Sequence, residues 1–136
     1  MSQNLTVGVL SFQGDFARHA ERLEELGATV ASIRTPEALG QIDGLVIPGG
    51  ESTTIGMLME RFGLIGAVRR RAEEGMPLFG TCAGAILMAT DIRGSEQPRL
   101  GLLEMEVIRN AYGRQIESFE ADLRSDSFGG EALRGV

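Results

Sequence analysis

The sequence predicts an α/β fold: an open, doubly wound, mostly parallel sheet with helices on both faces and an antiparallel segment at its edge. Three observations support this prediction. Short apolar runs rich in β-branched residues alternate with segments of about 10–15 residues that have helical spacing. Several of these apolar runs end in glycine-containing turns. After Thr90 the pattern changes to short alternating segments, which is typical of an antiparallel edge.

The elements follow from this pattern in order. We expect strands at 5–12, 28–33, 43–47 and 78–79, with the last of these buried on both faces. The first helix is expected to begin at Asp15, its N-cap, and to end at Gly27. The second is expected to begin at Ser52 or Thr53, as N-cap, and to end at Phe62. Further helices are expected over 64–74 and 85–89, with a single helical turn at 36–39.

The remainder is less regular. Residues 93–99 are expected to form a polar loop, and 100–108 and 118–123 to form strands of an antiparallel edge or hairpin. A turn-rich segment, 125–130, precedes residues 132–136, which are expected to begin another element. No repeat or linker divides the chain, so 1–136 is predicted to be a single domain.

Composition narrows the possible functions. The chain has 136 residues, 43% hydrophobic and 24% charged, as in an ordinary globular domain. Thirteen basic and 19 acidic residues give a net charge of −6, which argues against nucleic acid as a partner. No signal peptide precedes the first strand and no apolar stretch approaches the roughly 20 residues that span a bilayer, so we expect a cytoplasmic protein without membrane contact.

Three residue counts exclude further classes of site. Every basic residue other than the single His is Arg, so neither a Schiff-base lysine nor a P-loop lysine is available. One Cys rules out an internal disulfide, and one Cys with one His cannot build a usual zinc site, so no metal is expected.

The strongest chemical signal is Gly80-Thr81-Cys82-Ala83-Gly84, between a predicted strand and a predicted helix. A nucleophile held on a strained strand-to-helix turn needs small flanking residues. The N–H groups and positive dipole end of the following helix favour the reactive thiolate. The alternative is that Cys82 is simply a small buried apolar residue.

Two further loops are expected to meet this turn at the carboxyl ends of the strands: Gln13-Gly14-Asp15 and Pro48-Gly49-Gly50. The Gly49-Gly50 pair, together with the N–H of Ala83, could form an oxyanion hole. A tight turn is the alternative for Pro-Gly-Gly. The only His, His19, lies one turn into the first helix and is expected to be structural, so no general base is evident.

Several longer motifs resemble those of one family, the class I (triad) glutamine amidotransferases, which have a flavodoxin-like sheet, and within it the glutaminase subunits of pyridoxal 5′-phosphate synthase. The general marker is Gly-x-Cys-x-Gly at 80–84. The specific motifs are Gly-Gly-Glu-Ser-Thr-Thr at 49–54, Asn-Ala-Tyr-Gly-Arg-Gln at 110–115 and Ser-Phe-Glu-Ala-Asp-Leu at 118–123. The resemblance runs from Val7 to Val136.

The resemblance implies roles for particular residues. Cys82 would attack the side-chain amide of L-glutamine, with the N–H groups of Gly50 and Ala83 as the oxyanion hole. Glutamine would be bound by Gly50, Glu51, Ser52 and Arg109. Gln13 and Gly14 would contact the synthase subunit, which receives the ammonia. The glutaminase subunit itself would need no cofactor, because pyridoxal phosphate is the product of the complex.

One feature departs from the family pattern. The family's catalytic His and Glu lie in a His-Pro-Glu segment nearer the C-terminus, and the chain stops at Val136 without one. We therefore expect these 136 residues alone to lack two members of the triad and to be inactive as a glutaminase.

Two alternative functions stay open. A DJ-1/PfpI-like cysteine hydrolase or stress protein shares the sheet and the cysteine turn, but needs a Glu close to the Cys on the first helix. Here Glu21, Glu24 and Glu25 lie near the far end of that helix. The other alternative is a non-catalytic regulatory subunit that docks on a partner.

Overall fold

The structure is a computed structural model that describes residues 4–14, 16–113 and 119–135. Four parallel strands form the main sheet, in the spatial order β2-β1-β3-β4. The elements of this half are β1 (Thr6–Leu10), α1 (Phe16–Glu25), β2 (Thr29–Ile33), the 3₁₀ helix η1 (Glu37–Gln41), β3 (Gly44–Ile47), α2 (Ser52–Arg61), α3 (Leu64–Glu73) and β4 (Leu78–Gly80).

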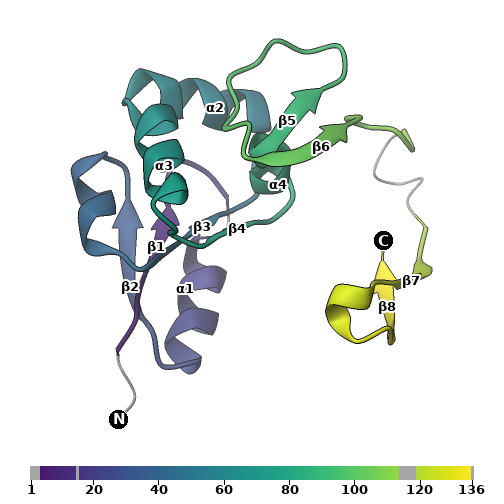
Figure 1. The fold of residues 1–136 in the computed structure, drawn as a ribbon, viewed down its shortest axis with the longest axis horizontal. Coiled ribbons are helices and arrows are strands. Elements are labelled where there is room, and N and C mark those ends of the chain that lie inside the picture. The colour runs from purple at the N-terminus through teal and green to yellow at the C-terminus, as the bar shows by residue number, and fades with distance from the viewer. Residues whose placement is uncertain (1–3, 15, 114–118, 136) are drawn as a thin grey trace.

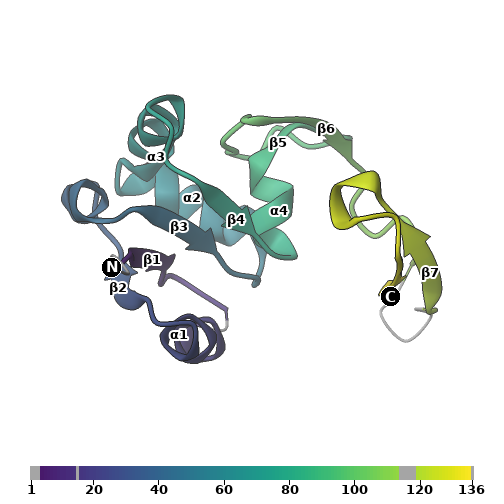
Figure 2. The ribbon, with the colours of Figure 1, turned by 60° about the horizontal axis from the view of Figure 1, so that its bottom comes forward.

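The winding reverses at β1. Helix α1 connects β1 to β2 on one face of the sheet, whereas α2 and α3 connect β3 to β4 on the other (Figures 1 and 2). Because β2 and β3 flank β1 on opposite sides, the loops after β1 and β3 diverge at its carboxyl end, where open α/β sheets bind ligands. This arrangement confirms the predicted doubly wound, mostly parallel sheet.

The core lies between the sheet and α2, α3 and α4 (Ala83–Met88). It is made of aliphatic residues and Met, since Ile55 and Met59 of α2 and Leu64 and Val68 of α3 are fully buried against the strands. Helix α1 contributes less: none of its side chains is fully buried, and Leu26 is exposed beyond the end of the helix. Gly27 ends that helix as predicted, with φ 91°. The predicted N-cap, Asp15, lies outside the described residues.

Strand β4 differs from its prediction. It is an edge strand of the four, and Phe79 is 60% exposed, so β4 is not buried on both faces. Helix α1 packs mainly on β1 and β2, at the other side of the sheet from β4. Pro77, Phe79 and Val46 line an apolar groove.

The C-terminal half forms two small sheets. Strand β5 (Ala89–Ile92) pairs in parallel with β6 (Leu103–Val107), and β7 (Ala121–Arg124) pairs antiparallel with β8 (Ala132–Gly135) through the 3₁₀ helix η3 (Asp126–Phe128). The β7–β8 hairpin lies to one side of the main sheet in both views (Figures 1 and 2).

This half corrects two expectations and confirms two. The helix after Cys82 ends at Met88, and Ala89 already belongs to β5, a strand too short to have a recognisable period. Residues 103–107 pair with β5, not with the later strand as a hairpin. The antiparallel segment exists, but it is formed by β7 and β8, so residues 132–135 do begin a further element. Ser118, the predicted start of the later strand, is outside the described residues.

Candidate active site

Cys82 occupies a strained turn between β4 and α4. Its backbone has φ 53° and ψ −113°, in a region that residues with a Cβ rarely adopt. Its side chain is exposed and not part of the core. The structure therefore confirms the predicted sharp strand-to-helix turn and contradicts the alternative of a buried apolar cysteine.

The flanking glycines allow this turn because their neighbours leave no space for a side chain. A Cβ on Gly84 would lie 1.9 Å from the carbonyl oxygen of Ile47. A Cβ on Gly80 would lie 2.7 Å from the carbonyl group of Gly84. The start of α4 is thus in direct contact with the end of β3, which fixes where the sulfur of Cys82 points.

The Pro48-Gly49-Gly50 loop lies beside the sulfur. A Cβ built on Gly49 would be 3.3 Å from Cβ and 3.9 Å from Sγ of Cys82. Gly50 has φ 137°, a conformation that only glycine adopts readily. Two loops that are more than 30 residues apart in the sequence therefore form one site, as predicted from the carboxyl ends of their strands.

The loop after β1 completes the arrangement. Gln13 Oε1 accepts a hydrogen bond from the backbone N–H of Glu51 at 2.9 Å. Gly14 packs so closely that a Cβ there would be 1.9 Å from the carbonyl oxygen of Gly49. Gln13 and Gly14 thus both contact the loop that lies beside Cys82.

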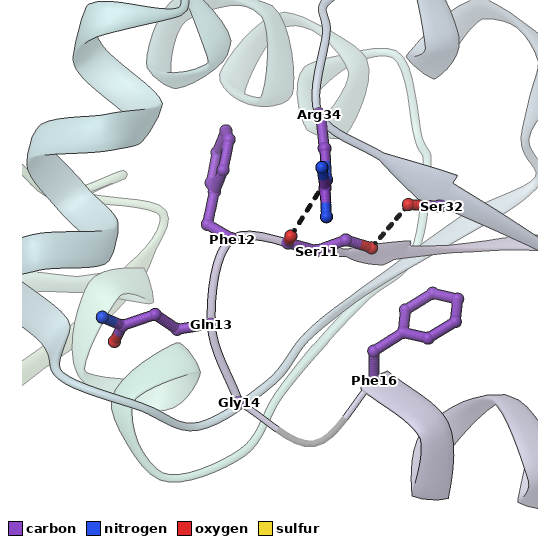
Figure 3. Close-up of a pocket in the computed structure, with 7 residues that line it drawn as sticks. All are labelled: Ser11, Phe12, Gln13, Gly14, Phe16, Ser32 and Arg34. Atoms are coloured by element: carbon purple, nitrogen blue, oxygen red, sulfur yellow. Dashed lines mark hydrogen bonds between the residues drawn. The ribbon is translucent and has the colours of Figure 1, made fainter.

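A pocket of about 370 Å³ is lined in part by this β1–α1 loop (Figure 3). Ser11, Phe12, Gln13, Gly14, Phe16, Ser32 and Arg34 line it. Arg34 Nε donates to the carbonyl oxygen of Ser11 at 3.1 Å, and the Ser32 hydroxyl donates to that of Ser11 at 2.8 Å. Cys82 does not line this pocket, so it is a surface feature beside the site.

Glu51 caps helix α2, which corrects the prediction that Ser52 or Thr53 would. Its carboxylate accepts from the backbone N–H of Thr54 at 2.8 Å and from that of Thr53 at 3.2 Å. The backbone hydrogen bond from Thr54 is the largest cause that lowers the pKa of Glu51 from 4.5 to about 2. Desolvation, the next largest effect, opposes it, and further hydrogen bonds from Thr53 and Thr54 outweigh that opposition. A carboxylate satisfies two N–H groups and favours the positive end of the helix dipole, so it displaces a hydroxyl as cap.

Arg109 reaches the same helix end from beyond β6. Its Nη2 forms an ion pair with Glu51 at 3.0 Å, and its Nη1 donates to Thr53 Oγ1 and to Gln97 Oε1, each at 3.1 Å. The structure therefore brings Arg109 and Glu51 together, 58 positions apart. Gln97 was not predicted, because it lies in a polar loop that carries no motif.

Two buried polar atoms of this region have no partner within the part of the chain that the structure describes: Ser52 Oγ and Gln97 Nε2. Ser52 is 2% and Gln97 7% exposed, which makes them the buried polar residues of the described chain. Unpaired buried polar groups are costly and call for a functional explanation.

His19 is close to the nucleophile turn. Its Nε2 lies 3.4 Å from Thr81 Oγ1, so this contact joins α1 to the residue before Cys82. No group of three His, Cys, Asp or Glu that could hold a metal ion occurs in residues 4–14, 16–113 and 119–135. Within the same ranges, no helix combines the length and the apolar character needed to cross a membrane.

A family model matches this arrangement over residues 9–136: the SNO glutamine amidotransferase family. The chain belongs to this family. The match includes all three loops of the site, 13–14, 49–51 and 80–84, in one continuous alignment.

Similar proteins and a solved structure support this family assignment. The chain is 50% identical over 132 residues to "Pyridoxal 5'-phosphate synthase subunit PdxT" of Carboxydothermus hydrogenoformans, covering 97% of this chain and 69% of that protein. It is 52% identical over 134 residues to the protein of the same name from Roseiflexus castenholzii, covering 97% and 71%. A crystal structure of a glutamine amidotransferase superposes with a TM-score of 0.83 at 53% identity, over 95% of this chain and 68% of that one.

Proposed function

We propose that this chain is the glutaminase of a pyridoxal 5′-phosphate synthase: it hydrolyses L-glutamine to L-glutamate and ammonia and passes the ammonia to a synthase subunit. Family membership and the name shared by its relatives support this function. The observation that carries it is the exposed sulfur of Cys82, on a positive-φ turn and facing the Gly49-Gly50 loop.

The chemistry begins at that sulfur. The Cys82 thiolate adds to the side-chain amide carbon of glutamine, and the negative charge moves to the amide oxygen. The N–H groups of Gly50 and Ala83 would stabilise that oxyanion. Collapse of the intermediate breaks the C–N bond, so ammonia leaves with one added proton and a glutamyl thioester remains. Water then attacks the thioester, which yields glutamate and regenerates the thiol.

Glutamine would be oriented at its amino acid end by Glu51, Ser52 and Arg109. The low pKa of Glu51 keeps its carboxylate ionised, as binding an ammonium group requires. Among the described residues, Arg109 makes three hydrogen bonds with its five guanidinium N–H groups, which leaves two that these residues do not use and that a carboxylate could accept from. Ser52 Oγ is buried and has no hydrogen-bond partner among the described residues, so its hydroxyl is not already committed to another group of that part of the chain.

The proton transfers belong to residues outside these three loops. The family resemblance assigns the general base and its carboxylate partner to a His-Pro-Glu segment after Val136. The resemblance does not assign that role to His19, whose Nε2 lies 3.4 Å from the Thr81 hydroxyl. The proposed hydrolysis therefore refers to the protein that includes this segment.

The synthase partner would dock on the β1–α1 loop. Gln13 and Gly14 contact the Gly49-Gly50 loop directly, so a subunit bound there could adjust the oxyanion hole. The ammonia would then be condensed in the synthase subunit with ribose 5-phosphate and glyceraldehyde 3-phosphate. The glutaminase chemistry at Cys82 uses no cofactor.

The test is glutamate release from glutamine by the full-length protein with its synthase subunit, before and after Cys82→Ala. We expect the substitution to abolish glutamate release and to leave subunit binding intact. Glutamate release that persists in Cys82→Ala would remove Cys82 from its role. Subunit binding without any glutamate release by the wild type would instead support the regulatory alternative.

A further inference from the structure

Gln97 lies in the loop between β5 and β6, and it is one of two buried polar residues of the described chain. Its Oε1 accepts hydrogen bonds from Arg109 Nη1 at 3.1 Å and from the Thr53 hydroxyl at 3.3 Å. Its backbone N–H donates to Ser95 Oγ at 3.2 Å, which fixes the loop around it. Hydrogen bonds thus fix both the backbone and the side-chain oxygen of Gln97 next to the proposed glutamine site.

The chemistry of its neighbours fixes which way the amide faces. A guanidinium group only donates hydrogen bonds, so the group that faces Arg109 must be the acceptor, Oε1. The opposite orientation would place N–H donors against N–H donors. The assignment leaves Nε2 without a partner among the described residues. An unpaired buried donor costs free energy, so the hydrogen bonds made by Oε1 must offset that cost.

Among the described residues, that oxygen is one of three acceptors on Arg109, and it differs from the other two. Glu51 is exposed and Thr53 is partly exposed, whereas Gln97 is 7% exposed. Hydrogen bonds to a charged donor are stronger when they are shielded from water. The hydrogen bond to Gln97 therefore holds the Arg109 guanidinium more firmly than the ion pair between Arg109 and Glu51, which lies at the surface.

We infer that Gln97 is a positioning residue for glutamine binding, acting through Arg109 and not through the reacting atoms. This inference rests on the proposed function, since it assigns Arg109 to the amino acid end of glutamine. An Arg109 held in place binds the ground state and the transition state equally. Its misplacement should therefore raise KM and leave kcat unchanged.

The test uses Gln97→Met in the full-length protein with its synthase subunit. Methionine keeps the length and volume of the side chain but offers Arg109 no oxygen. We expect KM for glutamine to rise about tenfold, the loss of one charge-assisted hydrogen bond, with kcat within about twofold. Glu96→Met, an exposed change next to it in the loop, is the matched control and should leave KM unchanged.

Two further variants separate positioning from a structural role. Gln97→Glu keeps an acceptor for Arg109 and removes the unpaired donor, so KM should return to within about threefold of the wild type. In an Arg109→Met background, Gln97→Met should cause no further loss of kcat/KM, because both changes remove the same interaction. Thermal melting of each variant reports any separate loss of stability.

Three results would overturn the inference. The first is an unchanged KM in Gln97→Met. The second is an equal rise of KM in Gln97→Met and Gln97→Glu. The third is an additive loss of kcat/KM when Gln97→Met is combined with Arg109→Met. Each of them requires a wild type that hydrolyses glutamine. A wild type without glutamine hydrolysis would contradict the proposed function instead, so the two failures are distinguishable.

Discussion

Gln13 Oε1 accepts a hydrogen bond from the backbone N–H of Glu51 at 2.9 Å, and this contact joins the loop after β1 to the loop after β3. The two loops are 38 positions apart, but β1 and β3 are neighbours in the sheet. The peptide that Gln13 holds follows directly after Gly50, which is assigned to the oxyanion hole. The position of that hole therefore depends on a side chain outside it.

Replacing Gln13 tests this dependence. We expect Gln13→Ala to lower kcat for glutamine about tenfold. Without the hydrogen bond from the Glu51 N–H to Gln13, the Gly49-Gly50 loop can adopt other conformations. The loss of stability should be about 1 kcal/mol or less, since the bond is exposed. The measurements are steady-state kinetics and urea unfolding, with Gln41→Ala, an exposed change at the end of η1, as control. Unchanged kinetics would show that the hydrogen bond does not set the loop.

Gly14 can be compared directly with Gly27, because the two glycines have nearly the same backbone φ angle. Gly14 has φ 87° and Gly27 has φ 91°, so Ala is strained equally at both. A Cβ at Gly14 would lie 1.9 Å from the oxygen of Gly49, whereas a Cβ at Gly27 meets nothing within 4 Å. We expect Gly14→Ala to lower kcat/KM about 10²-fold and Gly27→Ala to lower stability by about 1 kcal/mol without a kinetic effect. Equal kinetic effects of the two changes would contradict this account.

Gly84 tests the close approach of α4 to β3. A Cβ at Gly84 would lie 1.9 Å from the oxygen of Ile47, so α4 must move in Gly84→Ala, at a cost of about 3 kcal/mol. Gly66→Ala is the matched helical control: nothing lies within 4 Å of its Cβ position in α3, and it should stabilise the fold by about 0.5–1 kcal/mol. Urea unfolding of both variants measures these changes. The interpretation fails if Gly84→Ala is as stable as the wild type.

The low pKa of Glu51 predicts how stability changes with pH. The folded pKa of about 2 lies below the ordinary 4.5, so the unfolded chain binds more protons between these values. The contribution of the Glu51 carboxylate is fully present above about 4.5 and is lost as the pH falls toward about 2. The difference in unfolding free energy between the wild type and Glu51→Gln should therefore shrink over this range. An NMR titration that gave Glu51 an ordinary pKa would contradict the capping geometry.

The sequence was sufficient for the sheet and for the meeting of the three loops. The glycines around Cys82 and in the Pro48-Gly49-Gly50 loop predicted tight turns, and a Cβ at 49, 50, 80 or 84 would lie within 3.3 Å of a neighbouring atom. The alternation of strands and helices predicted the winding that brings those loops together. These features are local in the chain or follow from general rules of sheet topology.

What the sequence did not predict depends on distant contacts. The capping role of Glu51 was missed because propensity favours Ser or Thr over Glu as an N-cap. Arg109 and two N–H groups favour the Glu51 carboxylate only in the folded chain. Gln97 has no motif, and its burial comes from the packing of a loop. The exposure of Phe79 depends on the place of β4 at the edge of the sheet, which an apolar run of two residues cannot reveal.

The register of β3 against β4, with Ile47 opposite Gly80, aligns the end of β3 that leads to Gly49 with the end of β4 that leads to Cys82. A slip of one residue would displace Gly49 by about 3.3 Å along the strand and would turn the side chains of β4 to the other face. Mispaired chains would then carry a cysteine that glutamine analogues modify slowly. The rate at which such an analogue labels Cys82 during refolding would therefore report the moment at which the two strands reach their native alignment.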